Sequence, residues 1–223
     1  MAWDDTWEKV FQAQEWGKYP PEELVRFVAR CFKGVARRKQ IKILEVGCGP
    51  GANVWFLARE GFDVYGVDGS PTAIRQAQER LEQEGLRATL VVGDIISLNR
   101  LFPEQKFDAV IDVGCLSTNR TTDVEIILQQ IYSLLKPGGR LFSMLIATGT
   151  FGEGLGREIE PGTFDQITEG PLAGKGVTHF FSLEEVRKLM QPFIDVQIEA
   201  SNRSLDGLSH WVNLWVVQGV KGL

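Results

Sequence analysis

Three glycines at alternate positions have the clearest chemical use in this chain of 223 residues: Gly47, Gly49 and Gly51. They follow an apolar run and the acidic residue Glu45, and a helical pattern begins directly after them. This order predicts a strand, a tight turn and a helix. Glycine adopts backbone conformations that other residues avoid, and without a Cβ it lets a ligand approach the main chain. The segment therefore predicts a site for a nucleoside-type cofactor.

A carboxylate further along the chain fits the same kind of cofactor. Asp68 ends the next apolar segment, 62–67, and follows Gly51 by 17 positions, where it could accept both hydroxyl hydrogens of a ribose. The dinucleotide fingerprint places its third glycine three residues after the second, whereas Gly51 follows Gly49 by two. The loop therefore favours S-adenosylmethionine, which has no phosphate and needs only close backbone approach.

Five motifs in order extend this pattern over about 100 residues. They are LEVGCGPG (44–51), YGVDGS (65–70), VVGDI (91–95), FDAVIDVGCLS (107–117) and LKPGGRLF (135–142). In order and content they resemble the class I, S-adenosylmethionine-dependent methyltransferases of the small-molecule type. The resemblance implies methyl transfer by in-line displacement, with S-adenosylhomocysteine as the product. Two other interpretations stay open: a non-catalytic S-adenosylmethionine-binding protein and, against the glycine spacing, an NAD-type oxidoreductase.

The resemblance also implies roles for single residues. The three glycines would face the methionine portion and the ribose, with Glu45 orienting their loop. Asp68 would bind the ribose hydroxyls and Asp94 would accept from the adenine amino group, although either aspartate could instead only cap a helix. The full set implied for the cofactor is Glu45, Gly47, Gly49, Gly51, Asp68, Gly69, Ser70, Asp94, Ile95, Val113, Trp16 and Tyr19.

The residues that bind the methyl acceptor are less well defined. The resemblance places the segment 112–120 opposite the transferring methyl, and this segment lacks the Asn-Pro-Pro-Tyr motif of amino-group methyltransferases. Asn119 and Arg120 could clamp a carboxylate or phosphate, or could belong to a surface loop that starts a helix. Arg157 is a third candidate for the substrate. Asp112 and His179 are the candidate bases, and a base is useful only for an alcohol or ammonium acceptor.

Two segments could cover the site. The segment 148–181 holds many glycines between a strand and a helix, and loops of this length are usually functional lids or disordered. Five aromatic residues lie in the first 19 positions, at spacings typical of a packing stripe. The family often folds an N-terminal segment over the cofactor, so Trp16 and Tyr19 could close the pocket.

Strand and helix patterns alternate between residues 41 and 146, which predicts parallel strands and right-handed crossovers. Two later strand segments, 194–200 and 210–218, predict a hairpin. The expected fold class is α/β: a doubly wound, seven-stranded, mostly parallel sheet of the Rossmann-like methyltransferase type, with one antiparallel edge strand and helices on both faces. We expect one domain, 1–223, divided into an N-terminal helical cap (1–40), a cofactor-binding core (41–147), a substrate lid (148–181) and a C-terminal helix and hairpin (182–223).

The amino-acid composition limits the classes of substrate, partner and metal that we expect for this chain. A net charge of −5 argues against a strong grip on nucleic acid, so we expect a small-molecule acceptor. The first ten residues carry acids where a signal peptide is basic, and no run of 18 apolar residues occurs, so we expect a cytoplasmic protein without a membrane partner. The three cysteines and two histidines form no disulfide or metal-ligand pattern, and we expect no metal. The oligomeric state is open.

Overall fold

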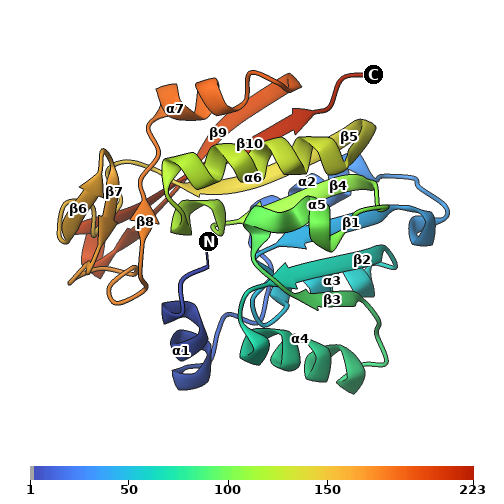
Figure 1. Cartoon of the computed structure of the whole chain (residues 1–223), viewed down its shortest axis with the longest axis horizontal. Helices are drawn as coiled ribbons and strands as arrows, with labels where there is room; N and C mark the ends of the chain where they lie inside the picture. The colour runs from blue at the N-terminus through green and yellow to red at the C-terminus, as the bar shows by residue number, and fades with distance from the viewer. Residues whose placement is uncertain (1–2) are drawn as a thin grey trace.

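Strands and helices alternate along the chain and form a sheet with helices around it (Figure 1). The glycine loop lies at the carboxyl ends of the strands of this sheet. The structure, a computed structural model, describes residues 3–223. Apolar residues fill the strands, and the helices carry an apolar stripe that faces the sheet. The elements of this part are β1 (Lys42–Val46), α3 (Ala52–Arg59), β2 (Asp63–Asp68), α4 (Pro71–Gln83), β3 (Thr89–Val92), η2 (Ile95–Ser97), α5 (Leu98–Leu101), β4 (Phe107–Val113), η3 (Leu116–Thr118), α6 (Thr121–Leu134) and β5 (Leu135–Ile146).

The main sheet has seven strands in the order β3-β2-β1-β4-β5-β10-β9. The first five run parallel, and the hairpin of β9 (Ile194–Leu205), η4 (Asp206–Leu208) and β10 (His210–Val220) completes the sheet. This confirms the predicted fold class. The single antiparallel strand, β10, lies one place in from the edge, because its hairpin partner β9 takes the edge position. The strand order reverses between β1 and β4, and ligands of such sheets bind at the carboxyl ends of the strands there.

Helices cover both faces of this sheet. The N-terminal part contributes α1 (Thr6–Ala13), α2 (Glu22–Cys31) and η1 (Arg38–Gln40), and the C-terminal part contributes α7 (Leu183–Leu189). In β1, Leu44 packs in the cluster that includes residues of α5, α6 and α7, whereas Ile43 packs in the opposite cluster with α2 and α3. This alternation follows from the two-residue period of a strand. Burial on both faces fixes the register that brings the glycine loop to the carboxyl edge.

The predicted lid, 148–181, has secondary structure of its own. It forms a three-stranded antiparallel sheet of β6 (Arg157–Glu160), β7 (Thr163–Asp165) and β8 (Thr178–His179). Ile167 and Phe180 pack on Ile146 at the end of β5 and attach this sheet to the domain. The expectation of an irregular loop was wrong, because strands of two to four residues are too short to give a readable pattern.

The four parts predicted for the chain correspond only roughly to the observed layers. Phe27 and Val28 of α2 are buried against the sheet, so α2 belongs to the core, and only α1 with the chain around it lies over the carboxyl edge (Figure 1). Among residues 3–223, no helix has both the length and the apolar character needed to cross a bilayer. The three cysteines of the chain are free thiols.

Candidate functional site

A cavity of about 420 Å³ lies at the carboxyl edge of the sheet, between the glycine loop, the N-terminal segment and the lid. Most of the residues predicted to bind the cofactor meet on its wall, although they come from five separate parts of the chain. Those on the wall are Trp16, Tyr19, Glu45, Gly47, Gly49, Asp68, Gly69, Asp94, Ile95 and Val113. Gly51 and Ser70 are absent from the wall and support it from behind.

The glycine loop has the conformation that its composition predicts. Gly47, Gly49 and Gly51 have φ angles of +63°, +50° and +80°, which favour glycine. A Cβ on Gly47 would lie 2.2 Å from the Sγ of Cys115, and one on Gly51 would lie 2.7 Å from the Cβ of Ala77. Internal packing therefore requires these two glycines, and the cavity gains open backbone as a result.

Asp68 connects the loop to the next turn. Its Oδ2 accepts a hydrogen bond from the Gly49 amide and its Oδ1 accepts one from the Ser70 amide, each at 2.8 Å. Burial raises the pKa of Asp68, and these two hydrogen bonds oppose that shift. Each carboxylate oxygen retains a second lone pair, so Asp68 can still accept hydroxyl hydrogens. Ser70 instead caps α4, where its Oγ accepts from the Ala73 amide at 3.0 Å.

Glu45 has an unsatisfied oxygen in the cavity wall. Its Oε1 accepts from the Asn53 side-chain amide at 2.6 Å, but its buried Oε2 has no hydrogen-bond partner. Burial raises the pKa of Glu45 to about 8, and Asp68 adds to the shift. A cationic ligand group would satisfy this oxygen and stabilise its charge. The orphaned oxygen and the open glycine backbone fit S-adenosylmethionine, which carries an ammonium and a sulfonium.

The N-terminal segment lies against the part of the wall predicted to hold adenine. The backbone amide of Trp3 donates to Oδ2 of Asp94 at 3.2 Å, and the Trp3 indole fills the space in front of Gly69. The ring of Phe11 lies over Gly49. Trp16 packs edge-on against Phe11, with ring centroids 5.5 Å apart. The predicted aromatic stripe is therefore a packed cluster that also lines the cavity.

Comparison with known proteins agrees with this geometry. Residues 43–139 match the sequence family described as a methyltransferase domain. A solved S-adenosylmethionine-dependent methyltransferase from Methanosarcina mazei has the same fold, with a TM-score of 0.64 at 23% identity over 82% of this chain and 92% of that chain. Residues 43–139 are thus identified as a methyltransferase domain, and the chain has the fold of the class I, S-adenosylmethionine-dependent methyltransferases.

Two curated relatives match a shorter part of the chain. The demethylmenaquinone methyltransferase of Tropheryma whipplei is 35% identical over 45% of this chain and 39% of its own length. The ubiquinone biosynthesis O-methyltransferase of Coxiella burnetii is 32% identical over 58% of this chain and 56% of its own length. The chain thus spans about half the length of these relatives.

The two residues predicted as bases lie off the cavity wall. Asp112 is fully buried, and its oxygens accept from the Leu116 amide at 3.0 Å and from the Ser143 hydroxyl at 2.5 Å. Burial raises the pKa of Asp112 to about 6, and these hydrogen bonds oppose the shift. Asp112 holds the segment after β4 in place, so its geometry does not match the expected role of a base.

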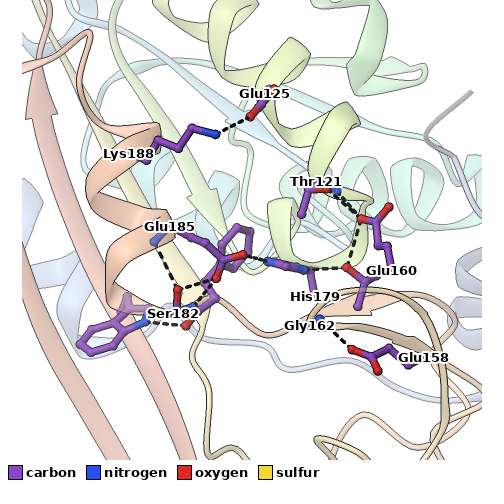
Figure 2. Close-up of polar contacts among 12 residues, drawn as sticks. Thr121, Glu125, Glu158, Glu160, Gly162, His179, Ser182, Glu185 and Lys188 are labelled. Carbon is purple, nitrogen blue, oxygen red and sulfur yellow. Dashed lines mark hydrogen bonds and ion pairs between the residues drawn. The ribbon is translucent and has the colours of Figure 1, made fainter.

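His179 belongs to the lid and is also fully buried (Figure 2). Its Nδ1 lies 2.6 Å from the Oγ1 of Thr163, and its Nε2 lies 3.4 Å from Oε1 of Glu185. Burial lowers the pKa of His179, and the nearby carboxylates of Glu185 and Glu160 oppose that shift. The histidine joins β7, β8 and the start of α7, which is a structural role and not the predicted catalytic one.

One of the three predicted substrate residues reaches the wall. Asn119 lines the cavity and its side-chain amide donates to the Cys115 carbonyl at 2.7 Å. Arg120 is exposed at the N-cap of α6, and Arg157 is paired with Asp165 on the lid surface, so neither faces the cavity. Arg157 lies on β6 of the lid sheet and pairs with Asp165 on β7, an arrangement that the sequence pattern did not indicate.

Several wall residues were not predicted. They come from the end of β5, the lid and the β9–β10 hairpin: Ile146, Thr150, Pro171, Leu172, Lys175, Arg203, Val212 and Leu214. Alternation in the predicted strand 210–218 could have indicated that Val212 and Leu214 share a face. The lid residues gave no comparable signal.

Proposed function

We propose that this chain transfers a methyl group from S-adenosylmethionine to a small-molecule acceptor. The observation that carries the proposal is that one cavity is lined by Gly47 and Gly49, by Asp68 and Asp94, and by Glu45, whose buried Oε2 has no hydrogen-bond partner. Hydrogen-bond acceptors for a cation, a ribose and an adenine are thus arranged along one wall. A shared fold alone would not support an activity.

The residues of the chain bind and align the reactants. Glu45 would hold the cationic portion, Asp68 the ribose hydroxyls, and Asp94 the adenine edge. When bound, S-adenosylmethionine supplies an electrophilic methyl group on a positively charged sulfur. The aromatic cluster of the N-terminal segment and the lid excludes water, and alignment of two reactants in a dry cavity supplies much of the acceleration such a displacement needs. Within residues 3–223, neither histidine lies on the wall.

The size of the cavity supports a small acceptor. A volume of about 420 Å³ falls in the range of small-molecule sites, and the lid and the N-terminal segment border it. One curated relative is named as a demethylmenaquinone methyltransferase and the other as a ubiquinone biosynthesis O-methyltransferase, and these names support a small-molecule acceptor. Three free thiols support a reducing compartment, so we place the reaction in the cytoplasm.

Calorimetric titration of S-adenosylmethionine and S-adenosylhomocysteine tests the cofactor site. We expect micromolar binding by the wild type and at least about a tenfold loss in Asp68→Ala, since two loop contacts and the ribose acceptor are removed. Asp63→Ala is the matched control, because Asp63 lies at the opposite end of β2 and is absent from the wall. No binding by the wild type would refute the proposal.

Transfer of a labelled methyl group to the small-molecule fraction of a cell extract tests catalysis. Label in that fraction supports the proposal, and its loss in Asp68→Ala ties the label to the site. Binding without any transfer would favour the non-catalytic alternative. Label that enters only RNA or protein would contradict a small-molecule acceptor.

A further inference from the structure

Three acids and the two cations of the cavity wall come from different parts of the fold. The acids Glu45, Asp68 and Asp94 come from β1, from β2 and from the turn after β3, on one half of the sheet. Lys175 comes from the lid, and Arg203 comes from β9, the strand at the other edge of the sheet. The three acids belong to the proposed cofactor site, so the two cations remain for the acceptor.

Neither cation has a carboxylate partner within residues 3–223. Lys175 is half-buried and its ammonium lies 5.0 Å from the centre of the Trp16 ring, but it forms no ion pair. Burial without an anion lowers the pKa of Lys175. Arg203 is exposed at the mouth of the cavity and its guanidinium also makes no ion pair or hydrogen bond. Both cations are therefore available to an anion that enters the cavity.

The cavity wall also includes an apolar surface. Leu214 is paired with Ile146 across β10 and β5, and Val212 follows the same face of β10. Arg203 is opposite Val212 in the register of β9 and β10, so it projects from that same face. Leu172 of the lid adds to this apolar wall.

One further acid of the wall lies near Lys175. Asp4 lines the cavity and its Oδ2 fills the space in front of Gly176, beside Lys175. Its Oδ1 accepts from the Thr6 amide at 2.8 Å at the start of α1. Asp4 is thus engaged at the start of a helix and forms no ion pair with Lys175, which leaves the ammonium uncompensated.

We infer that the acceptor is an apolar organic acid, with its carboxylate held by Lys175 and Arg203 and its body on the wall of Ile146, Val212 and Leu214. The inference rests on the proposed function and names the substrate class of that site. A guanidinium and an ammonium recognise a carboxylate by charge-assisted hydrogen bonds. An amine of the same shape would meet two like charges there and would bind poorly.

The test measures how tightly two matched series of small molecules bind to the protein saturated with S-adenosylhomocysteine. Tryptophan fluorescence and calorimetry report the binding. One series is 4-hydroxyphenylacetate, 4-hydroxyphenylacetamide and tyramine. The other is octanoate, octanamide and octylamine. In at least one series we expect the acid to bind about tenfold more tightly than its amide, and the amine more weakly than both. Equal binding of acid and amide in both series, or no binding at all, would overturn the inference.

Variants identify the residues responsible. Lys175→Met and Arg203→Met should each reduce the preference for the acid, and the double variant should bring acid and amide within about twofold. Lys188→Met and Arg187→Met are the matched controls, because both residues are exposed on α7 outside the cavity. A preference that survives in the double variant would overturn the inference. So would a Lys175→Met variant that loses affinity for S-adenosylhomocysteine and keeps the preference, because Lys175 would then serve the cofactor.

The two proposals can fail separately. Binding of S-adenosylhomocysteine is measured first, and its absence would count against the proposed function itself. Tight binding of S-adenosylhomocysteine together with indifference to acid, amide and amine would leave the proposed function intact and reject only the organic acid.

Discussion

The carboxylate of Glu8 in α1 accepts a hydrogen bond from the Thr72 hydroxyl at 2.7 Å, although 64 positions separate the two residues. The same carboxylate accepts from the hydroxyl of Ser70, which caps α4. These hydrogen bonds lower the pKa of Glu8, and a negative charge there also complements the N-terminus of α4. Glu8 therefore attaches the N-terminal segment to the turn that follows Asp68.

Glu8→Ala should release α1 without unfolding the domain. We expect faster amide exchange in residues 6–13 and several-fold weaker binding of S-adenosylhomocysteine, because the aromatic cluster no longer covers the cavity. Hydrogen exchange with mass spectrometry and calorimetry measure the two effects. Glu15→Ala is the control, since Glu15 is largely exposed and its carboxylate forms an ion pair with Lys18 at 3.7 Å. Unchanged exchange in α1 would show that other contacts suffice to hold it.

Glu45 should couple cofactor binding to the release of a proton. Its pKa of about 8 leaves the free protein mostly protonated at pH 7, and a bound cation favours the ionised form. Affinity for S-adenosylhomocysteine should therefore rise between pH 6 and pH 8. Calorimetry at pH 7 in buffers of different ionisation enthalpy should detect nearly one proton released per ligand. Glu45→Gln should remove both effects, and proton uptake by the wild type would contradict the assignment.

The same pKa also has a consequence for stability. Because the folded value of about 8 lies above the ordinary value of 4.5, ionisation of Glu45 opposes folding. The contribution that favours folding is complete below pH 4.5 and is lost as the pH rises toward 8. Urea unfolding of the free protein should show Glu45→Gln gaining stability relative to the wild type between pH 6 and pH 8. An equal difference at all pH values would refute this origin.

Gly51 should tolerate alanine far less well than Gly85. Both have positive φ angles, +80° and +65°, but only at Gly51 would a Cβ meet an atom, the Cβ of Ala77 at 2.7 Å. We expect a loss of about 1 kcal/mol for Gly85→Ala from the backbone alone, and about 3 kcal/mol for Gly51→Ala, measured by urea unfolding. The double variant Gly51→Ala, Ala77→Gly should lose less than the sum of its single changes. Equal losses at the two glycines would exclude the packing explanation.

His179 should make the lid sensitive to acid. Burial keeps its pKa below 6.5, so the neutral form favours folding above that pH and the contribution is lost as the pH falls. We expect amide exchange of β7 and β8 to accelerate, relative to α6, between pH 6.5 and pH 5.5. His179→Gln should remove most of this pH dependence, and His210→Gln should leave it. A lid that is equally protected at both pH values would contradict the role given to His179.

The family resemblance indicated most residues of the proposed cofactor wall, and the sequence pattern predicted the sheet and the glycine loop. These features depend on local pattern: strand period, helix period, and glycines that only a tight turn requires. Asp68 and Asp94 follow strands whose parallel order was predictable, so their meeting at one edge was predictable as well.

The residues on the proposed acceptor side of the cavity were not predictable from the sequence, because long-range packing brings them together. Lys175 and Arg203 lie 28 positions apart in the sequence and share a cavity only because the lid packs on the end of β5 beside the β9–β10 hairpin. The same packing buried His179 and paired Arg157 with Asp165, which removed both from the site that their chemistry had predicted for them. The type of a residue limits the chemistry of its side chain. Long-range packing decides which side chains come together, and the local strand and helix periods do not encode this packing.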